Sequence, residues 1–170
     1  EKFPAADTTL TTTMKSVGEA MAIGRNYATA LQKALRSLEK RGSSFHWGDE
    51  PRSADELLEI SRKPTDGRIV VLQQALRKGA TIEQAFEATG IDPWFLDQIV
   101  LINEVAGFVH QAAELDAATL RIAKEHGFSD AQVAQLRGIG EAEVRGIRHS
   151  LGVRPVYKTV DTCAGEFPAL

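Results

Sequence analysis

The chain has 170 residues, of which 43% are hydrophobic, and its formal net charge at pH 7 is −3. This length and hydrophobic content are enough to bury a core, either as one domain or as two small helical lobes that share a core, and they argue against disorder. A charge this close to zero argues against the basic surface that duplex nucleic acid requires.

Cysteine content and apolar runs indicate the compartment. The single cysteine, Cys163, cannot form an internal disulfide or build a thiolate metal site alone, which is typical of a reducing cytosol. The longest apolar runs, such as Ile69–Leu72 and Ile99–Ile102, are too short to cross a bilayer. We therefore expect a cytoplasmic protein. Because the chain opens on neither a start methionine nor a signal peptide, we expect it to be part of a longer polypeptide.

The first predicted elements are an extended segment, a long helix and a loop. Residues 1–14 contain several β-branched threonines and are expected to be extended. Ser16 and Glu19 match a capping box, which predicts a long helix that runs on to Gly42. Residues 42–52 combine glycine, serine and proline and are predicted to form a loop.

Start and stop signals for seven more helices follow at short intervals. The predicted starts are Ser53, Asp66, Thr81, Asp92, Asp116, Ser129 and Gly140. The predicted ends for which the sequence carries a signal are Pro64, Gly79, Gly90, Gly127, Leu136 and Leu151. Residues 153–157 are again expected to be extended. These signals predict an all-α fold of about eight helices in an orthogonal-type bundle, with short extended segments at both ends.

Two stretches of the chain align without gaps, Thr81–Ile99 and Ser129–Ile147. Each predicts a short capped helix, a glycine turn, an apolar plug (Ile91 or Ile139) and a second helix, which together form a helix-turn-helix unit. The equivalent positions that we expect to be buried are Leu96 with Val144 and Ile99 with Ile147.

This repeated unit raises the possibility of DNA binding. The second helix of the first copy carries Asp92 and Asp97, and that of the second copy carries Glu141 and Glu143. Phosphates would repel these carboxylates, since recognition helices need cations and amides on that face. We therefore interpret the unit as a packing device.

The sequence contains no recognisable catalytic or metal-binding constellation. The four histidines, at positions 46, 110, 126 and 149, are not paired at helical metal-ligand spacing, and His126 is expected to complement a helix C-terminus. Gly138-Ile139-Gly140 lacks the third glycine of a dinucleotide fingerprint. We accordingly predict no catalytic, cofactor-binding or metal-binding residue in this chain.

Trp94 and Phe95 are the candidate interaction residues. Adjacent side chains on one helix lie about 100° apart around its axis, so the two rings cannot point the same way. One is expected to fill the core. The other is expected to lie either in the core of the second lobe or in a contact surface.

The two ends of the chain carry motifs that are highly specific. Those near the start are Thr11–Glu19, Met21–Arg25 and Leu31–Arg36; those near the end are Pro155–Lys158, Val160–Ala164 and Glu166-Phe167; between them stand Asp92, Trp94–Leu96, Gly127-Phe128 and Asp130-Ala131. Together they resemble the large subunit of carbamoyl phosphate synthetases. The chain is similar to the oligomerisation domain between its two ATP-grasp halves.

The resemblance implies a division into three parts: residues 1–14 as the tail of the preceding ATP-grasp unit, 15–152 as the helical oligomerisation domain, and 153–170 as the linker into the second synthetase half. Ala20 and Gly165 depart slightly from the family's pattern. Ser43–Arg68 matches it poorly, so we expect a surface segment there.

The resemblance also implies a function. It implies a non-catalytic oligomerisation and spacer domain within a glutamine-dependent ligase, which makes carbamoyl phosphate from bicarbonate, ammonia and two ATP for arginine and pyrimidine synthesis. ATP with Mg or Mn would bind outside this chain, which itself needs no cofactor. The implied partners are other large subunits, the flanking ATP-grasp domains and the small amidotransferase subunit, with no nucleic acid and no membrane. A DNA-binding protein and a small helical enzyme remain the alternatives, and they would need a basic face or a titratable cluster.

Overall fold

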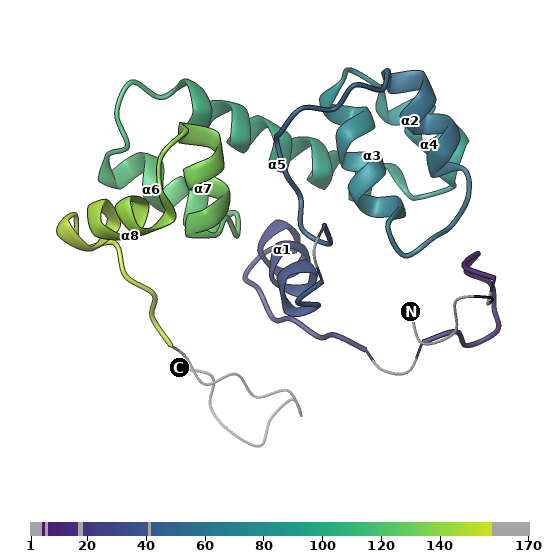
Figure 1. Cartoon of the computed structure of the whole chain (residues 1–170), viewed down its shortest axis with the longest axis horizontal. Coiled ribbons are helices and arrows are strands. Elements are labelled where there is room, and N and C mark those ends of the chain that lie inside the picture. Colours follow the sequence, from purple (N-terminus) through teal and green to yellow (C-terminus); the bar gives the residue numbers. More distant parts are fainter. Residues whose placement is uncertain (1–4, 6, 17–18, 41, 158–170) are drawn as a thin grey trace.

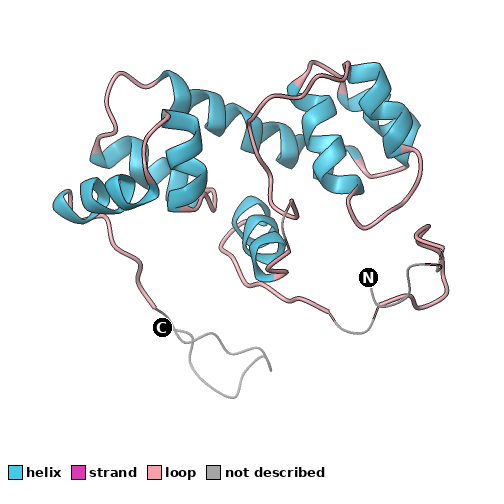
Figure 2. Ribbon diagram, in the orientation of Figure 1, coloured by secondary structure: helices cyan, strands magenta, loops and turns pink. Residues whose placement is uncertain are grey.

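The computed structural model describes residues 5, 7–16, 19–40 and 42–157, and these ranges contain eight α-helices and no strand (Figures 1 and 2). The helices are α1 (Tyr27–Ser37), α2 (Ala54–Ser61), α3 (Arg68–Arg77), α4 (Ile82–Thr89), α5 (Pro93–Gln111), α6 (Ala117–Glu125), α7 (Asp130–Arg137) and α8 (Glu141–Ser150). The predicted all-α fold of about eight helices is confirmed.

The long helix α5 joins two lobes (Figure 1). It begins beside α3 and α4, on which α2 packs, and it ends beside α6 and α7, with α8 packed on α7. The helix α1 packs against α5 as well. A single hydrophobic cluster runs through both lobes, and its fully buried members include Leu72, Ile99, Ile102 and Leu120. The lobes therefore share one core, and α5 is its axis.

Side-chain caps set most helix starts where the sequence predicts them. Complete capping boxes form at Ser53 with Glu56, Thr81 with Gln84, and Ser129 with Gln132; single caps form at Asp92 and Asp116. Each cap satisfies a backbone N–H that the first helical turn leaves without a partner. These predictions succeed because the cap and its target lie two or three residues apart in the chain.

The predicted start of the first helix is wrong. Ser16 and Glu19 lie outside any helix, and α1 begins only at Tyr27. It also ends at Ser37 rather than at Gly42. The capping-box pattern at residues 16–19 is therefore present without the helix that it normally precedes.

A close approach at Gly24 explains the late start. A Cβ atom on Gly24 would lie 2.6 Å from the backbone nitrogen of Ala30, so the chain folds back on the first turn of α1 here and only glycine fits. Asn26 then caps α1 by accepting the N–H of Thr29 at 2.8 Å. The amide nitrogen of Asn26 also donates to the carbonyl oxygen of Glu125, a tertiary contact that no local pattern contains.

The predicted cap of α3 is also wrong. Its N-cap position is occupied by Gly67, with no side-chain cap, whereas the carboxylate of Asp66 accepts a hydrogen bond from the ammonium of Lys40 at 2.7 Å. This ion pair lowers the pKa of Asp66, with the hydrogen bond from Lys40 as the largest cause. The side chain of Asp66, which local spacing predicts as the cap, instead forms a salt bridge with a residue 26 positions away in the chain.

The expectation that Ser43–Arg68 is a surface segment is wrong for its first part. Residues 43–50, which we call the strap, rise from the end of α1 and pass between the lobes toward α2 (Figure 1). Phe45 is only 1% exposed, and the ring of Trp47 stacks on Phe128 with a centroid distance of 5.1 Å. The strap is therefore part of the core.

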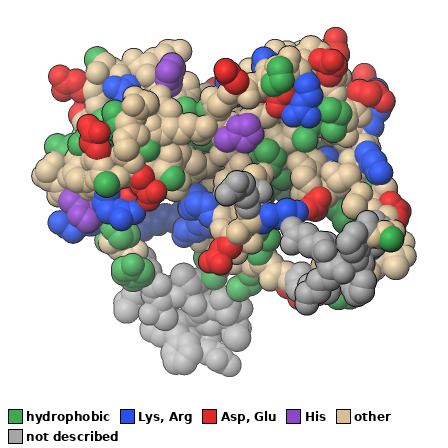
Figure 3. Space-filling view, viewed as in Figure 1, with side chains coloured by type: hydrophobic (Ala, Val, Ile, Leu, Met, Phe, Trp, Pro, Cys, Tyr) green, Lys and Arg blue, Asp and Glu red, His purple; other side chains and the backbone are tan. Residues whose placement is uncertain are grey.

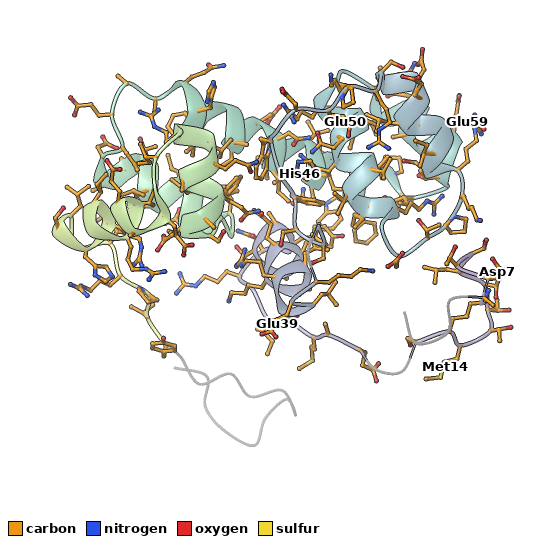
Figure 4. The ribbon with its side chains drawn as sticks, in the orientation of Figure 1. Asp7, Met14, Glu39, His46, Glu50 and Glu59 are labelled. Carbon is orange, nitrogen blue, oxygen red and sulfur yellow. The ribbon has the colours of Figure 1, made fainter. Side chains whose placement is uncertain are left out.

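Polar side chains from both lobes satisfy the strap's backbone. The carbonyl oxygen of His46 accepts from Gln74 at 2.6 Å, and that of Phe45 accepts from Gln132 at 3.1 Å. The indole nitrogen of Trp47 donates to Asn103 of α5 at 3.1 Å. Figure 4 marks His46 and Glu50 along this path, beside α3. An irregular segment can be buried here because these bonds replace the water that its polar groups would otherwise need.

The two repeat copies agree in local geometry. Gly90 and Gly138 both end their helices in the left-handed region, with φ of 69° and 66°. Leu96 and Val144 are both fully buried, as predicted. Ile99 is buried too, but its counterpart Ile147 is only partly buried. This difference arises because the second copy ends in α8, a short helix packed mainly on α7 at the margin of the molecule.

Candidate interaction surface

Three aromatic rings meet where α1 and α5 begin. Trp94 and Phe95 come from the first turn of α5, and Tyr27 is the first residue of α1. Their ring centroids lie 5.0 Å (Trp94–Phe95), 5.2 Å (Tyr27–Phe95) and 5.5 Å (Tyr27–Trp94) apart, at steep angles to one another. These are the distances of favourable edge-to-face contacts. We call these three residues the aromatic cluster.

The prediction that either Trp94 or Phe95 fills the core is wrong, because both rings lie largely at the surface. Trp94 is 53% exposed and Phe95 is 41% exposed. The core position in this turn belongs to Leu96, which is fully buried. Although neighbouring side chains on a helix lie about 100° apart, Tyr27 from α1 contacts the rings of both Trp94 and Phe95.

The helix α1 is held in place by the C-terminal end of α6. Four side chains at the start and along one face of α1 donate to backbone carbonyls at the last residue of α6 and in the turn after it, where carbonyls lack helical partners. The bonds are Asn26 to Glu125 at 3.2 Å, Thr29 to Glu125 at 2.7 Å, Gln32 to His126 at 2.7 Å and Arg36 to Gly127 at 2.5 Å. These hydrogen bonds fix the position of α1, and with it the position of Tyr27 beside Trp94 and Phe95.

The turn after α6 fits closely against α1. Gly127 has a φ of +85°, and a Cβ atom there would lie 3.0 Å from the Cα atom of Thr29. Next to it, His126 places its Nδ1 atom 2.8 Å from the carbonyl oxygen of Ile122. The prediction that His126 complements a helix C-terminus is confirmed.

The aromatic cluster is electrically neutral at physiological pH. Burial raises the pKa of the Tyr27 phenol above its ordinary value of 10.0, so it stays protonated. The cluster therefore offers apolar area with polar edges, the combination found at the centres of protein interfaces.

The part of the chain that the structure describes contains neither a cluster of metal-ligand residues nor a helix that could cross a membrane. Within it, no group of three or more histidine, cysteine, aspartate or glutamate side chains is placed to hold a metal ion. Nor does any helix of that part have the length and apolar character to span a bilayer.

Two members of the aromatic cluster, Trp94 and Phe95, are predicted from the sequence, whereas Tyr27 is not. Tyr27 falls inside the helix predicted to run from Ser16 to Gly42, so its place at a helix end is not evident from the sequence. Asn26 was the available signal, since asparagine is among the best N-cap residues and its target Thr29 stands three positions later.

These features define an all-α, two-lobed module that presents an aromatic surface beside a capped helix. The family model described as carbamoyl-phosphate synthetase large chain, oligomerisation domain, matches residues 19–152, and the chain belongs to this family.

Curated relatives agree with this assignment. The carbamoyl phosphate synthase large chain of Clavibacter sepedonicus is 79% identical over 170 residues, covering 100% of this chain and 16% of the relative. Those of Micrococcus luteus and Beutenbergia cavernae are 66% and 63% identical over 171 and 172 residues, each covering 99% of this chain and 15% or 16% of the relative. The chain thus spans about 16% of the length of the large chains it matches.

Proposed function

We propose that this chain is the non-catalytic oligomerisation and spacer module of a carbamoyl phosphate synthase large chain. The observation that carries the proposal is the aromatic cluster, an exposed group of three rings on a rigid support, in a family described by oligomerisation. Interfaces concentrate their binding energy in such aromatic anchors.

The whole large chain would be the ligase. It would make carbamoyl phosphate from bicarbonate, glutamine-derived ammonia and two ATP, with Mg or Mn in ATP-grasp sites outside this chain. Residues 1–14 would close the preceding ATP-grasp unit, 15–152 would form the module, and 153–170 would lead into the second synthetase half. The location would be the cytoplasm, and the products would serve arginine and pyrimidine synthesis.

The way the lobes are joined supports the spacer role. The helix α5 passes from one lobe to the other, the strap runs between them, and Gln74, Asn103 and Gln132 tie the strap to α3, α5 and α7. Bending the module would break these buried hydrogen bonds, and an unpaired buried polar group costs about 1–3 kcal/mol. The module would therefore keep a fixed geometry between the parts of the chain on either side.

The partner at the aromatic cluster would be a second large chain. The three rings would lose their remaining exposure on association, while the flanking ATP-grasp domains and the small amidotransferase subunit would contact other faces. Association also costs rigid-body entropy, which a few anchors alone do not offset. The module on its own would therefore retain only part of the association energy.

An experiment on the purified chain alone tests both parts of the proposal. Sedimentation velocity over a concentration series should show a monomer with weak self-association at most. Incubation with ATP and bicarbonate should release no bicarbonate-dependent phosphate. A large closed oligomer that survives dilution would contradict the weak association, and phosphate release that copurifies with the chain would contradict the non-catalytic role.

A further inference from the structure

Three cationic side chains converge on one carboxylate at the start of α7. Asp130 accepts the ammonium of Lys124 from α6 at 2.6 Å and two guanidinium nitrogens of Arg148 from α8, each at 3.1 Å. Arg145 from α8 approaches the same carboxylate at 3.6 Å. Figure 3 shows lysine and arginine side chains gathered along the lower margin of the lobe that carries α8.

A fourth cation comes from α1. Arg36 donates to the carbonyl oxygen of Gly127, and Lys124 donates to that of the next residue, Phe128, at 2.9 Å. Because these acceptors belong to adjacent residues, the charged ends of Arg36 and Lys124 lie near each other. We call Arg36, Lys124, Arg145 and Arg148 the cationic cluster.

The cationic cluster is not neutralised by its own carboxylates. Within the residues that the structure describes, its four charges face Asp130 and Glu141, the latter bound to Arg145 at 2.8 Å, which leaves two positive charges without a paired carboxylate there. This occurs in a chain whose formal net charge is −3. The side chains of Lys124 and Arg148 are partly removed from solvent, at 27% and 12% exposed, whereas that of Arg145 is 55% exposed. Partial burial strengthens the repulsion that bulk water would screen.

Arginine charges act on two nearby titratable groups. Burial is the largest cause that lowers the pKa of Lys124; the hydrogen bond and charge of Asp130 raise this pKa, and the charges of Arg148 and Arg36 lower it by smaller amounts. The pKa of His149 is lowered by burial and then by Arg154, Arg148 and Arg145. Burial is the main cause of both shifts, and a bound anion would offset the smaller contribution that the arginine charges make to each pKa.

We infer that the cationic cluster binds a small dianionic oxyanion of the phosphate class. A dianion matches the two uncompensated charges, whereas a single carboxylate would neutralise only one. Donors for it remain among the described residues, where Arg36 uses one of its five N–H groups and Lys124 has two acceptors for its three protons. Guanidinium and ammonium groups in this arrangement are the usual protein ligands of phosphate.

The test uses inorganic phosphate and the thermal unfolding of this chain, with sodium chloride added to equal ionic strength as the reference. The unfolding midpoint should rise saturably, by roughly 3–5 °C when phosphate exceeds its dissociation constant tenfold. Two-dimensional NMR during the titration should show saturable shifts of the backbone amides around residues 127–130 and 145–148.

Two substitutions and one matched control locate the effect. Arg145→Gln should weaken phosphate binding by about tenfold, and Glu141→Gln should strengthen it, because a competing carboxylate is lost. The control is Arg62→Gln: Arg62 has a similar exposure, 58% against 55% for Arg145, and pairs with Glu59 on its own helix in the other lobe. General stabilisation by phosphate acts on all variants equally, so the differences between variants measure the site.

Four results would overturn the inference. They are an equal rise with chloride, an equal loss of binding in Arg62→Gln, a weaker affinity in Glu141→Gln, and acetate binding as strongly as phosphate. A duplex DNA affinity that Arg145→Gln abolishes, with no response to inorganic phosphate, would instead assign the cationic cluster to nucleic acid.

Discussion

Phe45→Ala is expected to lower the free energy of unfolding by about 3–5 kcal/mol, the usual cost of removing a fully buried phenyl ring. Phe45 is the strap's most buried residue, and its ring belongs to the shared hydrophobic cluster. A cavity there would also loosen the strap, whose carbonyl groups are hydrogen-bonded by both lobes. The loss is a large share of the roughly 5–15 kcal/mol that stabilise a typical domain.

Urea unfolding followed by circular dichroism measures this change. The matched control is Phe86→Ala, because Phe86 is an exposed phenylalanine on α4, and its removal should cost less than about 1 kcal/mol. Equal costs for Phe45→Ala and Phe86→Ala would show that the strap is not part of the core.

Leu96→Ala is the second large expected effect, with a loss of about 2–5 kcal/mol. Leu96 is fully buried where the aromatic cluster meets the shared core, and its equivalent Val144 is fully buried in the second repeat copy. Val144→Ala should cost less, because fewer methyl groups are removed. Ile147→Ala should cost less than Ile99→Ala, since Ile147 is only partly buried.

Unfolding free energies of these four variants, with Asp97→Ala as an exposed reference, test the ranking. Asp97→Ala should be nearly neutral, because surface changes are usually within about 0.5 kcal/mol. If Leu96→Ala lowers the free energy of unfolding no more than Asp97→Ala does, the prediction that the buried positions of the two repeat copies stabilise the fold is wrong.

The elements that sequence predicted well are those decided within one helical turn. Thr81 and Ser129 each have their capping partner three residues later, and Gly90 and Gly138 end their helices through their own backbone freedom. The α-helical class and the family followed from such signals and from the end motifs. The burial of Leu96 and Val144 likewise followed from helical spacing alone.

The elements that sequence missed are those decided by distant partners. Asn26 starts α1 with the help of Glu125, and Asp66 is taken from its cap position by Lys40. Phe45 lies in a predicted loop, and its burial depends on distant residues such as Gln132 of α7, which donates to its carbonyl oxygen. The spacing of Trp94 and Phe95 likewise contains nothing about Tyr27. Such contacts join residues up to about a hundred positions apart, which a local pattern does not encode.

The most direct test of the central claim is sedimentation velocity of a whole large chain that contains this module and carries Trp94→Gln. Phe86→Gln is the control, because it removes an aromatic side chain of similar exposure, 46% against 53% for Trp94, outside the aromatic cluster. We expect Trp94→Gln to weaken self-association by roughly 2 kcal/mol or more, as the loss of a central aromatic anchor does, while Phe86→Gln leaves it unchanged. Identical association of Trp94→Gln and the unmodified large chain would contradict the claim that the aromatic cluster is the surface through which large chains associate.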